Sequence, residues 1–433
     1  MSEPPGRSVP NLDFLTAAAA ARDKADRRRA RLAIGFSILV TVAWFVGVLL
    51  TDNFGRVWDN IVATPTMMFG SFVAGSTPQG GGAVAFPVFT KGLGVPSEVA
   101  RTFSLAIQSV GMTAAMVAIL LRRRTIDVPA VLWSLPMGII GLFLGLFLLS
   151  DRSKPFWPSI LPGAYVKVLF TLLVLAMAFV VFLGSRVPVR EVRTSVSPLG
   201  GRQIAFLMVG ALLGGMASSQ VGSGSDVLFY LVVVVMLGLE PRIGVPSSVL
   251  VMTAVSLTGF VYLGLIQGHL DVAVAGGEVT RVGATIIADP SQYPADRFDL
   301  LGLWLAAVPV VCWGAPLGSA FAARITSRQL AMFVAALAAA EGVTTIVFVR
   351  ELHSDPGLIA FGIVGAAVLV GGLWLCVRYR HRVAEVRFDP SSSITRESVD
   401  VGGDYVRDAE SRRGAAGADD PPSPDTGGGT ERP

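Results

Sequence analysis

The chain has 433 residues, of which 52% are hydrophobic and 15% are charged, and its mean hydropathy is +0.62. Soluble proteins carry about 25% charged residues, so this composition excludes an ordinary soluble domain and indicates an all-α polytopic membrane protein. The net charge of +4 comes without a basic stripe interleaved with aromatic residues, which argues against nucleic acid as a partner and leaves the lipid bilayer.

The chain begins with a polar region, residues 1–31, which ends in the basic run RDKADRRRAR and is expected to be a cytoplasmic arm. Residues 32–60 should form an extra first transmembrane helix and an outer loop, because the apolar run from Leu32 to Leu50 has close to the ~20 residues that cross a bilayer. Since no small-residue cleavage pattern follows this run, we expect the helix to be retained.

The apolar segments that follow recur in the same order in two halves, residues 61–184 and residues 203–348, joined by a cytoplasmic linker at 185–202. The expected segments are Ile61 to Ala74, Ala83 to Gly94, Phe103 to Leu121, Val128 to Leu149 and Ala164 to Gly184, then Gln203 to Ala217, Val227 to Leu239, Val245 to Ile266, Leu301 to Ala323 and Gln329 to Phe348. Each half is therefore a glycine-broken re-entrant hairpin plus three transmembrane helices. Three is an odd number of crossings, so the second half enters from the opposite face and the repeats are inverted.

The end of the chain adds one extra transmembrane helix within residues 349–382, followed by residues 383–433, which are too poor in apolar residues to bury a core. We expect the latter to be a disordered cytoplasmic tail. The Lys and Arg clusters fall on one side of the predicted topology, and the acidic loop at 267–300 falls on the other. The positive-inside rule then predicts a multi-pass protein of the cell membrane with both termini in the cytoplasm.

Two dense runs of glycine and small polar residues interrupt the apolar pattern, GSTPQGGGAVAF from Gly75 to Phe86 and SSQVGSGSDVLF from Ser218 to Phe229. An unwound segment frees amides and carbonyls that a bilayer cannot solvate, so such breaks persist only where they are buried in protein or line a cavity. Two breaks in corresponding places favour a substrate site at the repeat interface. The alternative is that the glycines only let helices pack closely.

A half-helix that starts after a glycine break presents free amides and about half a positive charge, which suits a small anion as substrate. The candidate substrate-binding residues are Ser76, Gln79, Gly80, Gly81, Gly82, Arg101, Thr102, Ser219, Gln220, Gly222, Ser223, Gly224, Ser225, Ser247 and Ser248.

Three of the charged residues in or beside apolar segments are candidates for a function, because a charge costs about 2.5 to 3.5 kcal/mol at a helix centre. Arg101 is either the fixed cation that attracts the substrate or an interfacial side chain that snorkels. Asp226 is either a proton acceptor for coupling or a helix cap. Glu341 is a second candidate for coupling, as a proton site or as one half of an ion pair.

In each half the order is small-residue helix, glycine break, short apolar helix, Gly-Leu turn, proline and a Ser/Thr at the start of a long helix. This order resembles the TauE/SafE sulfite-exporter-like permease family over residues 61–348, most specifically in GSTPQGGGAVAFPVF with VPSEVARTFSL and in VGSGSDVLFY with LEPRIGVPSSVL. The chain departs from the family pattern at Arg101, Phe103 and Pro246. The resemblance implies a secondary permease for small sulfur-containing anions, such as sulfite, sulfonates or related carboxylates, coupled to protons.

Other classes of function find little support in the sequence. The two cysteines, Cys312 and Cys376, and the three histidines, none inside a predicted span, predict no metal site and no cofactor. No phosphate-binding G-x-x-x-x-G-K-[ST] motif is present, and an intramembrane protease would need partners that the chain does not offer, so no enzyme is predicted. An anion-selective channel with re-entrant glycine loops stays open as the alternative. A homo-oligomer also stays open, since residues 365–372 can pack against a second copy.

Overall fold

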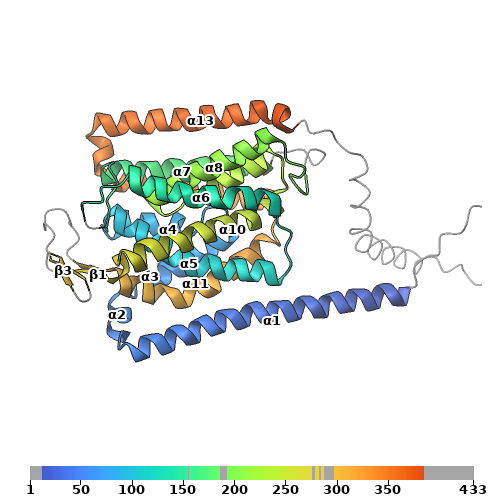
Figure 1. Ribbon diagram of the computed structural model, residues 1–433, viewed down its shortest axis with the longest axis horizontal. Helices are drawn as coiled ribbons and strands as arrows, with labels where there is room; N and C mark the ends of the chain where they lie inside the picture. Colours follow the sequence, from blue (N-terminus) through green and yellow to red (C-terminus); the bar gives the residue numbers. More distant parts are fainter. Residues whose placement is uncertain are drawn as a thin grey trace, which may run out of the picture. The chain divides into compact units, whose positions relative to one another are not determined.

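A computed structural model describes residues 12–154, 156–185, 193–275, 278–281, 284–286 and 297–384 (Figure 1). Residues 26–386 form one compact unit. The helices are α1 (Leu12–Leu50), α2 (Phe54–Asp59), α3 (Ala63–Ser76), α4 (Gly82–Pro87), α5 (Ser97–Leu121), α6 (Val128–Leu148), α7 (Gly163–Ser185), α8 (Gly201–Val221), α9 (Ser225–Tyr230), α10 (Pro241–Gly259), α11 (Leu300–Ala322), α12 (Ser327–Phe348) and α13 (Pro356–Ala384). Short π-helical turns extend α4 (η1, Val88–Gly92), α9 (η3, Leu231–Met236) and α10 (η4, Phe260–Ile266), and η5 (His269–Asp271) and η7 (Arg350–His353) are 3₁₀ turns.

The predicted helical membrane architecture is confirmed. Nine helices of the described residues are long and apolar enough to cross a membrane, by length and composition. The two long helices after the breaks begin earlier than the hydropathy pattern suggested, at Ser97 and Pro241, because Pro96 and Pro241 fix the backbone at the helix starts. Residues 1–11 of the predicted arm and nearly all of the predicted tail lie outside the described residues, and the rest of the arm is the first part of α1.

The loop between η4 and α11 contains four short strands that the sequence analysis did not anticipate. They are β1 (Val272–Ala275), β2 (Glu278–Arg281), β3 (Ala284–Ile286) and β4 (Arg297–Asp299), and they pair antiparallel in the order β3-β2-β1-β4. Asp299 ends the last strand, caps α11 by accepting a hydrogen bond from the Gly302 amide at 3.0 Å, and forms a 2.6 Å ion pair with Arg56 on α2. The loop is therefore anchored to the helices.

Packing between the two halves follows an exchange pattern. The helix before the first break, α3, packs against α11, and the helix before the second break, α8, packs against α6. The helices after the breaks, α5 and α10, pack against each other, and so do α7 and α12. Each long helix of the two halves thus finds its main partner in the other half, whereas the short helices α4 and α9 pack mainly against α3 and α8 of their own half.

Close approach of backbones explains why glycines are frequent at these two interfaces. A methyl group added to Gly75 of α3 would lie 1.9 Å from the carbonyl oxygen of Ala315 on α11. In the corresponding pair, a methyl group added to Gly141 of α6 would lie 2.0 Å from the carbonyl oxygen of Leu212 on α8. Small residues at helix contacts are the usual means of tight packing in membranes. The alternative interpretation of the glycine runs, that their glycines let helices pack closely, therefore holds for Gly75, the first residue of the first run.

The first and last spans lie at the edge of this arrangement. α1 is attached to α11, since the Ser37 hydroxyl donates to the Cys312 carbonyl at 2.6 Å and the Trp44 indole donates to the Leu305 carbonyl at 2.8 Å. α13 packs against α7 and η3. Both spans are mostly exposed along their length, which suits helices that face lipid.

Candidate functional site

The first glycine break separates α3 from α4. Helix α3 ends at Ser76, and Thr77 follows with extended backbone. Gly80 has φ +67°, in the left-handed region, and the chain then re-enters a helix at Gly82. A side chain at Gly80 would be strained, so glycine is required there.

The second break separates α8 from α9 in the same manner. Helix α8 ends at Val221, Gly222 follows with φ +75°, and Gly224 has φ +138° before α9 begins at Ser225. The two predicted interruptions are therefore present, and each is about five residues or shorter. Positive φ at matched positions, Gly80 and Gly222, supports the pairing of these glycines that the sequence pattern suggested.

The two breaks meet. The Ser223 hydroxyl donates a 2.8 Å hydrogen bond to the carbonyl of Gln79, and a methyl group added to Gly82 would lie 3.0 Å from the Ser223 Cβ. A methyl group added to Gly80 would lie 3.1 Å from Oδ2 of Asp226. Segments 144 residues apart in the chain therefore form one contact, and no side chain larger than hydrogen fits at Gly80.

Helix α5 also packs against the place where the two breaks meet. Arg101, Ser104 and Gln108 lie on one face of the helix, because they are three and four residues apart. The Gln108 amide donates to the Gly222 carbonyl at 2.7 Å, and the Ser104 Cβ would lie 2.6 Å from a methyl group on Gly222. Gln108 was not predicted as a site residue. Its position seven residues after Arg101, on the same face of the helix, is the signal that would have found it.

Arg101 is buried, with 1% of its surface exposed, so it does not snorkel to the interface. Its guanidinium donates to the carbonyls of Phe156 (2.6 Å), Trp157 (3.0 Å) and Ser219 (3.2 Å), and its Nε has no hydrogen-bond partner. None of the ion pairs between described residues involves Arg101. The carboxylate of Glu98, one turn earlier on α5, acts on this charge electrostatically without forming an ion pair with it. A cation buried without a direct ion pair is costly, which favours the presence of an anion nearby.

An aromatic cluster covers Arg101. Phe156 and Trp157 have left-handed backbone, with φ of 60° and 51°, and this conformation turns both carbonyls onto the guanidinium. Their rings contact those of Tyr262 and His269, with centroid distances of 5.5 to 6.0 Å. Non-glycine residues with positive φ cost free energy and persist where the surroundings hold them. The cluster closes the Arg101 side of the site.

Asp226 is fully buried and faces the first break. Its Oδ1 accepts from the Val227 amide at 3.0 Å in the first turn of α9, so the helix-capping interpretation holds for one oxygen. Its Oδ2, which lies toward Gly80, has no hydrogen-bond partner. One oxygen of this carboxyl group is therefore available to a proton or a ligand.

Further buried polar atoms around the contact also have no partner among the described residues. Both amide atoms of Gln79, Oε1 of Gln108 and Oε1 of Gln220 belong to this set. Buried polar groups are nearly always hydrogen-bonded, so their accumulation at one place indicates a site for water or a ligand. A cavity of about 10 Å³ borders Gln79, Ser223 and Gly224, which is close to the minimum for one water. The site is therefore closed in this conformation.

Several predicted site residues already have hydrogen bonds, some within their own helix and some to a neighbouring helix. The hydroxyls of Ser76, Thr102 and Ser248 donate to the carbonyls of Val73, Glu98 and Val245. The Ser219 hydroxyl donates to Met216, the Gln220 amide donates to Gly145 at 3.2 Å, and the Ser225 amide donates to the Ser218 hydroxyl at 3.0 Å. Gly81 has ordinary backbone (φ −69°) and contacts Gln108 and Met67.

Ser247 lies away from the contact, where its hydroxyl accepts from the Asp127 amide at 2.9 Å and donates to the Ile243 carbonyl. It links the loop before α6 to α10. Neither Ser247 nor Ser248 is brought to the breaks by a contact in the structure.

Glu341 on α12 forms a buried ion pair with Lys91 on η1, and the two side chains are 3% and 2% exposed. Lys91 also donates to the Thr345 hydroxyl at 2.7 Å, and the Thr171 hydroxyl donates to Glu341 at 2.9 Å. A cavity of about 310 Å³, lined mainly by apolar side chains, runs between this pair and Gln79. Of the two roles predicted for Glu341, the structure contains the ion pair.

Among the described residues, no group of three or more His, Cys, Asp or Glu side chains gathers where a metal could bind. The family model described as sulfite exporter TauE/SafE matches residues 63–345 of the chain. No curated protein and no solved structure matches the chain significantly.

Proposed function

Because this chain belongs to the sulfite exporter TauE/SafE family, a family of membrane transporters, we propose that it is a secondary permease for small sulfur-containing anions, with flux coupled to protons. The observation that carries the proposal is the meeting of the two glycine breaks, with buried polar atoms left unpaired around them. Sulfite, sulfonates and related organic anions are the substrate class.

The anion binds between the two breaks in this proposal. Freed amides near Gly80 and Gly222, the amide groups of Gln79 and Gln108 and the buried charge of Arg101 supply donors and positive potential. Fixed donors in a water-excluded site act strongly, because little solvent screens them. The cavity between the breaks has room for about one water, which corresponds to a closed site in this conformation.

The two halves are inverted repeats in this account. The exchange of helix partners, α3 with α11 and α8 with α6, is the pattern that a two-fold axis relating the halves produces. The π-helical turns that end the two broken hairpins show the same exchange, since η1 of the first half contacts α12 and η3 of the second half contacts α7. Inverted repeats with broken helices at their interface support alternating access by rocking of one half against the other.

The basic end of the molecule faces the cytoplasm in this account, with the chain in the cell membrane. In Figure 1 the sheet lies at one end of the helices, and the turn between α5 and α6 and the C-terminal end of α13 lie at the other. The second end carries Arg122 to Arg124 and Arg378, in keeping with the positive-inside rule. Both termini are then cytoplasmic.

Asp226 is the coupling residue that the geometry favours. An ionised carboxylate beside a bound anion repels it, whereas a protonated carboxyl can donate a hydrogen bond to it. Binding of the anion is therefore linked to uptake of a proton at Oδ2, the oxygen without a partner. Glu341 is a weaker candidate, because its charge is already compensated by Lys91.

Flux in proteoliposomes tests this function. Labelled sulfite, a sulfonate and a plain carboxylate are compared with and without an imposed pH gradient. The proposal predicts saturable, competitive flux of a sulfur oxyanion that the pH gradient drives. Unsaturable flux that ignores pH would instead favour an anion-selective channel, and no flux of any of the three anions would overturn the substrate class.

A further inference from the structure

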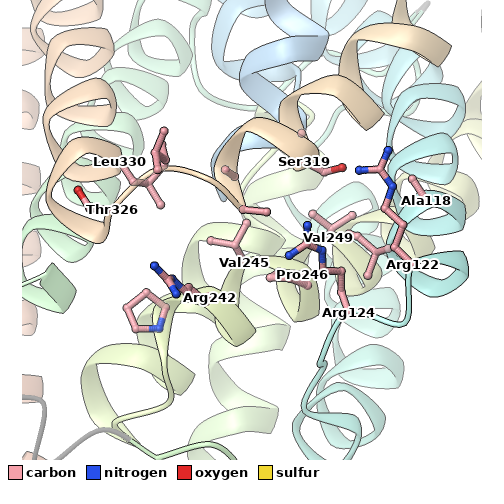
Figure 2. A pocket seen from close by; sticks show the side chains of 16 residues that line it. Ala118, Arg122, Arg124, Arg242, Val245, Pro246, Val249, Ser319, Thr326 and Leu330 are labelled. Atoms are coloured by element: carbon pink, nitrogen blue, oxygen red, sulfur yellow. The ribbon is translucent and has the colours of Figure 1, made fainter. Parts of the chain in front are cut away.

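Another cavity, of about 130 Å³, lies where α5 and α11 end and α10 begins (Figure 2). A cavity needs about 10–15 Å³ to hold one water, so this one has room for a small solute with its hydration. Its lining includes Arg122, Arg124 and Arg242, together with Pro246 and Gly75. We call it the arginine vestibule.

Local backbone geometry directs the arginines of the α5 terminus into the vestibule. Helix α5 ends at Leu121 and Arg122 caps it. Arg123 adopts left-handed backbone, with φ of 50°, so the chain turns sharply and the following residue, Arg124, returns to the cavity. Figure 2 shows Arg122 and Arg124 on one side and Arg242, from the first turn of α10, on the other.

Within the part of the chain that the structure describes, no carboxylate pairs with these three charges. Among the described residues, no Asp or Glu lines the vestibule, and none of the ion pairs involves these arginines. The nearest carboxylate along the chain from Arg124, that of Asp127, accepts instead from the amides of Ala130 and Val196. The Nε of Arg122 is buried without a partner.

The neighbouring positive charges change the pKa of Arg122. Burial lowers the pKa of its guanidinium, and the charges of Arg124 and Arg324 lower it further. Like charges held together without a counter-ion destabilise one another, and an anion between them would relieve that repulsion.

The vestibule leads toward the first break. Gly75, one residue before the end of α3, forms part of its lining. Pro246 stands in the second half where Arg101 stands in the first, at the offset of 145 residues that also pairs Pro96 with Pro241. In the first half the long Arg101 side chain is buried and fills its surroundings. In the second half the short ring of Pro246 leaves room for the vestibule, which it lines.

We propose that the arginine vestibule is a second anion site, in which Arg122, Arg124 and Arg242 bind a small oxyanion at the basic end of the molecule, before it enters the site between the breaks. Guanidinium groups suit this ligand, because their planar fork donates in pairs to sulfur or phosphorus oxyanions. The role in transport rests on the proposed function, but binding of an oxyanion does not.

Equilibrium binding of ³⁵S-labelled inorganic sulfate to the purified full-length protein in neutral detergent tests the site. The triple variant Arg122→Gln/Arg124→Gln/Arg242→Gln is compared with Arg123→Gln, which removes an exposed arginine from the same turn without touching the vestibule. We expect roughly tenfold weaker binding for each arginine removed, and therefore about a thousandfold weaker binding for the triple variant, with Arg123→Gln unchanged. Equal affinity of the triple variant and the wild type would overturn the proposal.

Two further experiments ask whether the bound oxyanion is free or belongs to a lipid, and whether the vestibule takes part in transport. Native mass spectrometry measures the lipid bound to the wild type and to the triple variant in nanodiscs with and without phosphatidylglycerol. If the two proteins differ in bound phosphatidylglycerol but not in sulfate binding, the vestibule is a site for a lipid phosphate and not for a free oxyanion. In liposomes, the triple variant should raise the KM for flux that starts from the basic face by at least tenfold and leave the KM from the other face unchanged. Sulfate binding that depends on the arginines, in a protein that moves no sulfur anion, would uphold the vestibule and reject the proposed function.

Discussion

Replacement of the buried pair Lys91 and Glu341 separates a structural role of Glu341 from a role in proton coupling. Both charged groups are almost completely buried, and hydroxyls of Thr345 and Thr171 complete their hydrogen bonds. Removal of one partner leaves an uncompensated buried charge, which costs about 3–5 kcal/mol. We therefore expect Lys91→Met and Glu341→Gln each to lower the free energy of unfolding by about this amount.

The double variant Lys91→Met/Glu341→Gln should recover most of that loss, because replacing a buried pair by uncharged side chains is often nearly neutral. With a double variant that costs only about 1 kcal/mol, the double-mutant cycle then gives a coupling energy of about 5–9 kcal/mol. If the pair only fastens η1 to α12, the double variant also keeps pH-driven flux, since Asp226 remains in place.

Denaturant unfolding in mixed micelles, followed by tryptophan fluorescence, measures the free energies, and flux in proteoliposomes measures the coupling. Lys154→Met is the matched control, because it breaks an exposed pair with Asp151 at 3.6 Å and should cost less than about 1 kcal/mol. Single variants no less stable than this control would refute the reasoning about burial. A stable double variant whose flux no longer responds to pH would place the coupling proton on Glu341.

Three other perturbations test the site and its orientation. Asp226→Asn should retain exchange of anion across the membrane but lose accumulation driven by a pH gradient, and retained pH-driven accumulation would contradict the coupling role. Gly224→Ala should destabilise the protein by about 1–3 kcal/mol in thermal unfolding and abolish flux, because φ is +138° and the new methyl group would lie 2.9 Å from a neighbouring side chain. Gly81→Ala should be tolerated, since its nearest neighbour would be at 3.5 Å and its backbone is ordinary; equal effects of the two substitutions would contradict the geometry of the breaks. In a cysteine-free background, Arg152→Cys should react with an impermeant maleimide added outside cells while Arg123→Cys should not, and the reverse pattern would invert the topology.

Local features of the sequence were sufficient to predict the order of the spans and the two breaks. Hydropathy over about 20 residues identifies a span, and glycine at φ-positive positions such as Gly80 and Gly222 is a property of single residues. The prolines at 96 and 241 likewise mark the helix starts that the apolar pattern alone placed later.

Contacts between distant segments could not be predicted in the same way. Lys91 and Glu341 are 250 residues apart, and neither hydropathy nor spacing links them. Ser247 and Thr102 occupy similar places near the starts of α10 and α5. The Ser247 hydroxyl nevertheless accepts a hydrogen bond from the Asp127 amide, whereas the Thr102 hydroxyl bonds only to a carbonyl of its own helix. Gln108 was missed because a single amide in an apolar helix is informative only together with Arg101 on the same face. The sheet between η4 and α11 was missed because its strands are only three or four residues long.

The most direct test of the central claim is a structure with the bound anion. The sulfur oxyanion that the flux assay identifies is replaced by its selenium analogue, and anomalous diffraction locates the selenium. The account predicts a peak between the two breaks, within hydrogen-bond reach of the amides near Gly80 and Gly222 and of the Gln108 side chain. A selenium peak elsewhere in the protein, with none between the breaks, would contradict it.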